Sequence, residues 1–278
     1  MKTLTLLILF TLLMGEVSAG GGWPQEKNNG YFKLSHYQIR AEYFFDHTGA
    51  IIAIPTVSYF NNTLYAEYGI TSRITAITNF SFFSGSIQKE NSSLNISKDK
   101  ISGFGDSDFI FKYGIIPKGK FVLSTSITLG VPLGVNNGGI EKKLQTGDEE
   151  FNQMLSVDLS RSFGKGNFYL STLLGYNNRN KGFSDEIRYG FEMGYKLSKI
   201  WVINRIYGIK SLYNGIESSV NTIGIFNNNT EFLSITPEII YEAKEYFGIT
   251  CSAGFATYGR RIMANPSFSA GIYLKIVQ

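Results

Sequence analysis

Two acids and a lysine lie within an otherwise apolar run, Gly103 to Ile116. Asp106 and Asp108 are two positions apart, so on a strand both carboxylates share one face and could approach a single hard cation such as Ca²⁺. That cation needs several more oxygen ligands, and no neighbouring segment supplies them at a recognisable spacing. We therefore expect no metal or other cofactor, and predict that Asp106 lies near a rim while Asp108 and Lys112 line the polar face of a strand.

The two histidines, His36 and His47, raise the alternative of a barrel lipid hydrolase, because a serine nucleophile normally needs a histidine base held by a third group. His36 alternates with Arg40 and Glu42 along a predicted strand, which suggests a row of polar residues on one face. His47 falls in the following loop. Neither histidine stands in the asparagine–histidine–serine context of barrel phospholipases, so we predict that the protein is not an enzyme.

The first nineteen residues have the features of a secretory signal peptide. Lys2 is followed by an uncharged run from Leu4 to Met14 and by a small-residue exit ending at Ala19. The apolar run is too short to span a membrane as a helix. We predict a signal peptide over residues 1–19 and a flexible periplasmic lead-in over residues 20–30. The single cysteine, Cys251, excludes a disulfide within the chain, and we expect it to face lipid.

Composition and alternation indicate an all-β chain. The sequence contains 30 glycines, 17 tyrosines and 22 phenylalanines but only 6 prolines, as is common in strand-rich proteins with polar loops. The charges are scattered along the chain, which argues against a nucleic-acid partner. From Asp185 to Leu197, apolar residues occupy every second position and polar or glycine residues the others. This period of two predicts strands with one apolar and one polar face.

About twelve such segments follow one another, an even number within the range of outer-membrane barrels. Tight connections alternate with long polar loops, of which the largest are residues 85–103, 133–150 and 211–230. A soluble β-sandwich shares the alternating strands but normally has shorter ones. We predict a transmembrane antiparallel up-and-down β-barrel of about twelve strands over residues 31–278. Aromatic residues beside the tight turns would form an interfacial girdle: Tyr68, Tyr113, Phe163, Tyr195, Trp201 and Phe247.

Three segments together carry a family resemblance. They are Tyr65 to Phe80, the glycine-rich opening Gly103-Phe104-Gly105-Asp106, and the strand Ser124 to Gly134 followed by Thr146-Gly147-Asp148. This combination resembles the bacterial outer-membrane barrel family labelled after the meta pathway of phenol degradation. The resemblance implies a transporter-like barrel that acts as a pore or uptake channel, and it covers most of the chain beyond the signal peptide.

The polar faces of the predicted strands would line the lumen. Both signs of charge occur there, so we expect ion pairs that narrow the lumen. We predict a passive channel for small solutes, hydrophobic ones among them; the alternatives are a non-transporting barrel with adhesive loops and the hydrolase. Expected partners are outer-membrane lipid and lipopolysaccharide, the barrel assembly machinery and the solute, with the oligomeric state open. The predicted lumen-lining residues are His36, Arg40, Glu42, Glu67, Asp108, Lys112, Asp158, Arg188, Glu192, Lys196, Glu238 and Glu242.

Overall fold

In the computed structural model, residues 21–91, 97–216 and 225–278 are described. The predicted signal peptide lies outside the described residues. Almost every regular element is a strand, and one 3-10 helix spans Gly164–Gly166. The strands are β1 (Gly30–Phe45), β2 (Ile51–Gly69), β3 (Ile74–Gln88), β4 (Asp99–Gly103), β5 (Ser107–Ile116), β6 (Val122–Val131), β7 (Asn152–Phe163), β8 (Phe168–Arg179), β9 (Glu186–Leu197), β10 (Ile200–Ser211), β11 (Glu231–Lys244), β12 (Phe247–Arg260), β13 (Ile262–Met263) and β14 (Ser267–Ile276).

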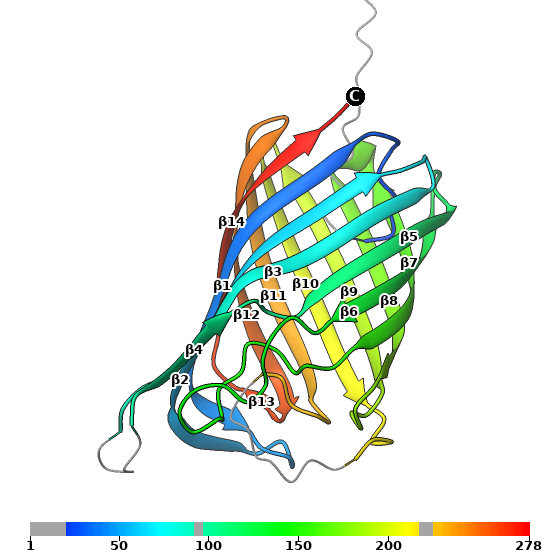
Figure 1. Cartoon of the computed structure of the whole chain (residues 1–278). Coiled ribbons are helices and arrows are strands. Elements are labelled where there is room, and N and C mark those ends of the chain that lie inside the picture. The colour runs from blue at the N-terminus through cyan, green and yellow to red at the C-terminus, as the bar shows by residue number, and fades with distance from the viewer. Residues whose placement is uncertain (1–20, 92–96, 217–224) are drawn as a thin grey trace, which may run out of the picture.

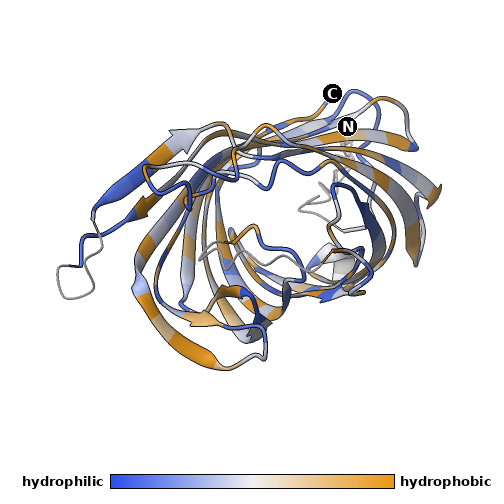
Figure 2. Cartoon of the chain, turned by 60° about the horizontal axis from the view of Figure 1, so that its bottom comes forward, coloured by the Kyte–Doolittle hydropathy of each residue, from blue (hydrophilic) through white to orange (hydrophobic). Residues whose placement is uncertain are grey.

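The sheet closes on itself to form a barrel (Figures 1 and 2). Each of twelve long strands pairs with the strand before and the strand after it in the ring, and all of these pairings are antiparallel. Closure is made by β1, which pairs with both β2 and β14. Leu34, in the first half of β1, lies opposite Leu64 on one side and Ile272 on the other. A closed ring leaves neither of these strands with an unpaired edge, as a sheet in lipid requires.

The two ends of the barrel differ. At one end the strands are joined by short turns, such as the one between β9 and β10, where Leu197 pairs with Ile200. The C-terminal end of β14 lies at the same end (Figure 1). The longer connections all lie at the opposite end, so short and long links alternate as the sequence predicted. We call these the short-turn end and the long-loop end.

The predicted strands are confirmed, with differences at the long-loop end. β2 begins at Ile51, and β3 continues to Gln88. The stretch predicted as one loop over residues 85–103 therefore contains the end of β3 and the short strand β4, which pairs with it. The alternation of apolar and polar residues fades here because these strand ends extend beyond the apolar belt, where neither face must be apolar.

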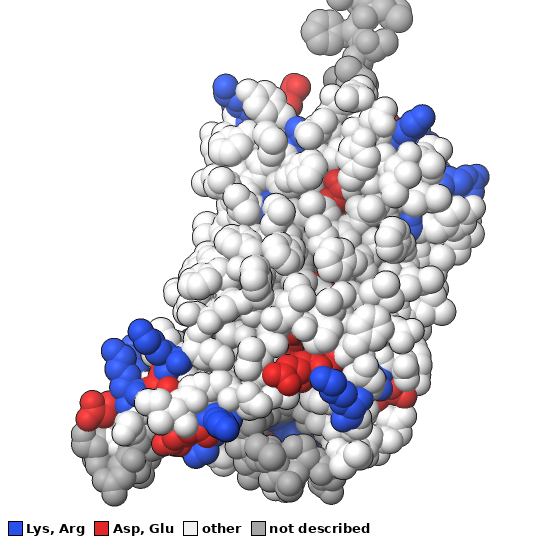
Figure 3. Space-filling model, in the orientation of Figure 1, with Lys and Arg blue, Asp and Glu red and all other residues white. Residues whose placement is uncertain are grey.

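The outer surface carries an apolar belt. In Figure 3 the charged side chains on the visible face gather toward the two ends, and uncharged residues cover the middle. Large apolar side chains are exposed along every long strand, among them Phe111, Leu155, Leu174, Ile239 and Phe268. In water such a surface would be unfavourable, whereas hydrocarbon accommodates it. Among the described residues, no helix has the length and hydropathy needed to cross a bilayer.

Candidate functional site

Strand β5 shows how the barrel separates its faces. Phe111 exposes 54% of its surface, while its neighbour Lys112 exposes 6%. Phe109 and Tyr113 are exposed with Phe111, and Asp108 lies on the same face as Lys112. The exposed residues are thus the apolar ones and the sheltered residues the charged ones, which is the reverse of a soluble sheet. The inner face of the barrel is therefore the candidate functional site, and it comprises the lining of a lumen.

An arginine that the sequence did not single out organises one wall of the lumen. The guanidinium of Arg205, on β10, forms ion pairs with Glu192 on β9 and Glu238 on β11. Lys33 on β1 lies 3.8 Å from the same Glu238 carboxylate, and the hydroxyl of Tyr169 donates a hydrogen bond of 2.6 Å to Glu192. Each carboxylate on this wall therefore has a cation or a donor, as buried charges require.

A second cluster lies near the short-turn end. Glu242 on β11 accepts Lys196 at 2.5 Å and Lys275 at 3.2 Å. The two lysines come from β9 and β14, on either side of β11 in the ring. Trp201 packs beside Lys196, whose ammonium lies 5.5 Å from the centre of the indole ring. The carboxylate thus holds two cations in the lumen, and these three side chains together carry one positive charge more than negative.

A third group of charges lies toward the long-loop end. Arg188 on β9 binds Glu186 at 2.9 Å, and the opposite charge of Asp108, four strands away on β5, interacts with Arg188 across the interior. Nearby, Arg179 at the end of β8 forms ion pairs of 2.6–3.0 Å with Asp148, Glu150 and Glu186. The guanidinium of Arg179 therefore helps to anchor the long loop that carries Asp148 to the barrel wall.

Asp106 takes part in that anchorage. Its carboxylate accepts hydrogen bonds from the backbone N–H groups of Gly134, at 2.9 Å, and Asp148, at 2.7 Å. Among the described residues, no three His, Cys, Asp or Glu side chains are grouped as a metal ion would require. Burial and the neighbouring Asp106 raise the pKa of the Asp148 carboxyl to about 7, although Arg179 opposes the shift. The two carboxyls therefore titrate as a pair.

Three of the predicted lumen residues lie on the outer face. His36, Arg40 and Glu42 point away from the lumen, and their strand presents Ile39 and Ala41 to the interior instead. The prediction failed because, in the second half of β1, the inward-facing residues are apolar and the outward-facing residues are polar. Its inner face there packs against an apolar cluster, so the polar residues fall on the outside. The structure places the other nine on the inner face: Glu67, Asp108, Lys112, Asp158, Arg188, Glu192, Lys196, Glu238 and Glu242.

The outer position of His36 also bears on the hydrolase hypothesis. Its Nδ1 atom shares a hydrogen bond of 2.9 Å with the Asn62 side-chain oxygen, and its ring stacks on Phe60. The amide of Asn62 in turn donates to the Phe83 carbonyl, beside a β-bulge in β3. His36 therefore supports the barrel wall. His47 lies in the turn between β1 and β2.

Trp201, predicted to belong to the interfacial girdle, lies inside the barrel. It exposes 3% of its surface and packs at 5.6 Å against Tyr169. Tyr68, Tyr113 and Tyr195 are exposed on the outside, as a girdle requires. The interior cluster near the short-turn end contains Tyr31, Tyr169, Trp201, Ile203, Ile240 and Tyr273, with Trp23 and Tyr65 packed against it.

The predicted lead-in over residues 20–30 contacts the inner wall of the barrel through residues 21–25, while residues 26–28 are exposed. Gly22 and Gln25 are buried, and the segment makes backbone hydrogen bonds with Gly69 at the end of β2. Trp23 meets the ring of Tyr169 edge-on at 5.6 Å. The glycines and polar residues of this segment resemble a linker in sequence, whereas their position depends on partners far along the chain.

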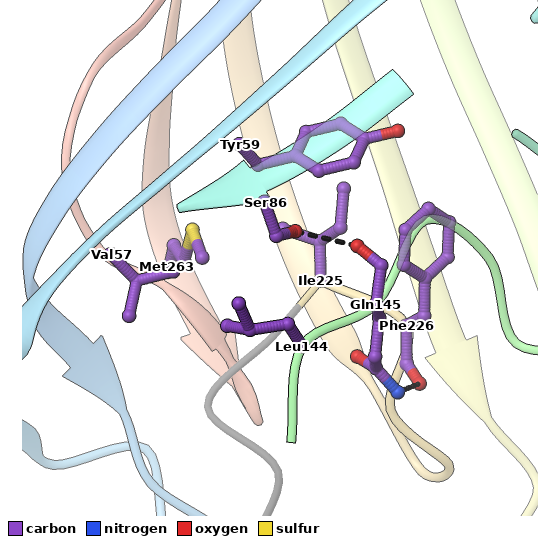
Figure 4. Close-up of a pocket in the computed structure, with 8 residues that line it drawn as sticks. All are labelled: Val57, Tyr59, Ser86, Leu144, Gln145, Ile225, Phe226 and Met263. Carbon is purple, nitrogen blue, oxygen red and sulfur yellow. Dashed lines mark hydrogen bonds between the residues drawn. The ribbon is translucent and has the colours of Figure 1, made fainter. Parts of the chain in front are cut away.

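The long-loop end of the lumen has an apolar wall. Val57, Tyr59 and Met263 pack there against Phe226 from the loop between β10 and β11 (Figure 4). Gln145 joins the two long loops, because its side-chain amide donates to the Phe226 carbonyl at 3.3 Å. The remaining space among these residues admits the centre of a water-sized sphere over about 10 Å³, which is room for about one water. The loops thus pack closely over this wall.

The comparisons with known proteins identify the fold. No family model matches the chain, and no curated protein matches it. The structure of an outer-membrane channel from Pseudomonas putida F1 is 12% identical, with a TM-score of 0.65, over 94% of this chain and all of the other. The NanC porin is 9% identical, with a TM-score of 0.54, over 88% of this chain and all of the other. The KdgM porin is 6% identical, with a TM-score of 0.51, over 89% of this chain and 99% of the other. The chain therefore has the closed antiparallel barrel fold that these outer-membrane proteins share.

Proposed function

We propose that this protein is a passive channel of the bacterial outer membrane for small solutes, hydrophobic ones among them. The observation that carries the proposal is the inverted polarity of the barrel, with an apolar belt outside and charged residues such as Arg205 and Glu238 inside. A charged side chain loses its hydration free energy in a dry interior. The many charges on the inner face therefore favour a lumen that holds water or solute.

The location is inferred from several features taken together. The predicted signal peptide directs the chain out of the cytoplasm, and closed antiparallel barrels with an apolar belt are typical of outer membranes. The proteins with similar structures are described as an outer-membrane channel and as porins. These features agree with the resemblance to the phenol meta-pathway family. In this location the barrel would contact outer-membrane lipid and lipopolysaccharide and would depend on the barrel assembly machinery.

The charge pattern of the lumen favours solutes without a large net charge. Lys33, Arg205, Glu192 and Glu238 neutralise one another along one wall. A strongly selective ion pore needs a ring or row of one sign instead. Small neutral molecules fit this pattern, and the resemblance to the phenol meta-pathway family favours those with an apolar portion.

Liposome swelling and planar-bilayer recordings of the refolded protein test the proposal. We expect flux of small neutral solutes, including aromatic alcohols, to exceed that of charged molecules of equal size, and we expect weak ion selectivity. Heat-modifiable migration on gels provides the control for correct folding. A folded barrel without conductance or solute flux would contradict the channel and would favour a surface protein with adhesive loops.

A further inference from the structure

We call residues 21–26 the inner segment. It runs along one side of the inner wall of the barrel near the short-turn end. Its first anchors are on β5, β6 and β7. Lys112 donates a hydrogen bond to the Gly21 carbonyl, Ser124 donates to the Gly22 carbonyl, and the Gly22 N–H donates to Ser160 Oγ at 2.8 Å. The backbone of the segment is thus bonded to three adjacent strands.

The segment then continues to β3 and β2. The backbone N–H of Gln25 donates to Thr75 Oγ1 at 2.8 Å, and its side-chain amide donates to Glu67 at 2.7 Å. Glu67 exposes 1% of its surface and also accepts the Tyr65 hydroxyl. Near the middle of the segment, Trp23 packs on Tyr169 of β8. The inner segment therefore contacts every strand from β8 round to β2 on one side of the ring.

Aromatic side chains occupy the other side of the ring at the same end. Tyr169 and Trp201 lie in contact on β8 and β10, Tyr273 and Tyr31 stack at 5.3 Å on β14 and β1, and Tyr65 on β2 completes the series. These side chains and the inner segment meet at Tyr169 on β8 and at β2. Together they line most of the circumference of the lumen near the short-turn end, with Ile240 of β11 in the same cluster.

We propose that the inner segment is a gate, which closes the periplasmic exit when it is docked and opens it when it leaves the wall. This inference rests on the proposed channel function and adds to it the part of the chain that controls passage. The aromatic half of the closure belongs to strands of the barrel and cannot leave. The inner segment joins β1 on its C-terminal side, and cleavage of the predicted signal peptide after residue 19 would leave its other side without a covalent link to the barrel.

The anchors of the inner segment are of a kind that can be released. They are mainly hydrogen bonds to hydroxyl groups and backbone carbonyls, and each contributes a net free energy similar to the entropy cost of fixing one residue. The lumen-facing hydroxyls of Ser124, Ser160 and Thr75 are readily rehydrated when the segment leaves. Docked and released states therefore differ little in free energy, and a solute can shift the balance between them.

A reversible disulfide tests the gate in the full chain. A Cβ atom at Gly22 would lie 3.0 Å from Ser160 Oγ, so cysteines at these positions suit disulfide geometry. The variant is Gly22→Cys with Ser160→Cys, in a Cys251→Ser background that removes the native thiol. We expect loss of conductance and solute flux in the oxidised protein and recovery after reduction. Each single cysteine in the same background, treated alike, provides the matched control.

The outcomes distinguish the gate from the channel. Equal conductance before and after reduction, with the crosslink verified by mass spectrometry, overturns the gate and leaves the channel standing. Absence of flux in the wild type and in every variant, despite a folded barrel, overturns both.

A second variant loosens the gate without a crosslink. Trp23→Ala removes the contact with Tyr169, and we expect a higher open probability than in the wild type. Trp23→Phe keeps an aromatic edge at this position and should restore the wild-type value. An open probability unchanged by Trp23→Ala overturns the proposal, because release of the segment would then have no effect on passage.

Discussion

Arg205 and Glu238 form an ion pair on the inner face of neighbouring strands, and the side chain of Glu238 retains only 5% of its exposure. The pair is extended by Glu192 and Lys33, so the four charges form a continuous row along the lumen wall. In this row each charge lies beside a charge of the opposite sign. The attraction between them offsets the cost of removing the ionised groups from water inside the barrel.

Replacement of Arg205 by leucine should destabilise the barrel. Glu192 and Glu238 would then share a wall without their main cation, which costs about 2–4 kcal/mol of unfolding free energy where the groups are sheltered. Urea titration in detergent micelles, followed by heat-modifiable migration, measures the change. Arg40→Leu is the matched control, because its pair with Glu42 is exposed on the outside and contributes less than about 1 kcal/mol. Equal losses in the two variants would contradict the assigned faces.

Replacement of Glu242 by glutamine should make the channel prefer anions. Lys196 and Lys275 would lose the carboxylate that both bind, which raises the positive potential near the short-turn end. The reversal potential across a potassium chloride gradient measures the effect. The opposite shift is expected for Lys275→Met, and an unchanged reversal potential in both variants would show that ions do not pass this cluster.

His36 should be dispensable for passage. Its side chain lies on the outer surface, bonded to Asn62, so His36→Ala leaves the lumen unchanged. We expect the conductance and reversal potential of the wild type, together with a small loss of stability from the hydrogen bond, on the order of 1 kcal/mol. A change in ion selectivity on this replacement would place the imidazole in the lumen and refute its assigned position.

Stability should fall as the pH rises through the titration of Asp106 and Asp148. Burial raises the pKa of Asp148 to about 7 from its usual 3.8, and burial also raises the pKa of Asp106. The folded protein thus binds more protons than the unfolded chain in this range. The stabilisation from protonation is complete below about pH 4 and is lost as the pH rises through about 7.

Thermal unfolding between these pH values measures the effect in the wild type and in Asp148→Asn. The variant cannot titrate at this position, so its melting temperature should vary less with pH. Asp46→Asn is the control, because hydrogen bonds from Thr48 lower the pKa of Asp46 and it stays ionised over the range. An identical pH dependence in Asp148→Asn and the wild type would exclude the carboxyl pair as its source.

Much of the barrel could be predicted from local pattern. The alternation in β9 assigns each residue of the strand to a face, because Arg188, Glu192 and Lys196 have one parity and Phe191 has the other. β1 and β10 lack this contrast. In β10, Trp201 and Ile203 point inward among aromatic rings. Both faces of this strand are therefore largely apolar, and the alternation does not reveal that Arg205 points into the lumen. The arginine at position 205 within this apolar strand was the sequence feature that could have indicated a charged residue in the lumen.

The inner segment shows the limit of local reasoning most clearly. Gly22 and Gln25 belong to a short glycine-rich stretch without strand or helix propensity, and their hydrogen-bond partners are as much as 138 positions away. The pairing of Arg179 with three carboxylates depends in the same way on a loop that folds back to the wall. Such contacts have no periodic signature in the sequence.

The sequence by itself determined the class of fold, because period-two alternation, strand length and the rhythm of short and long connections are consequences of crossing a bilayer with strands. Only the tertiary structure decided which charges meet, which polar residues of β1 lie outside, and where residues 21–26 lie. These depend on closure of the ring, since closure brings β8 opposite β1 and encloses a lumen in which distant side chains must satisfy one another.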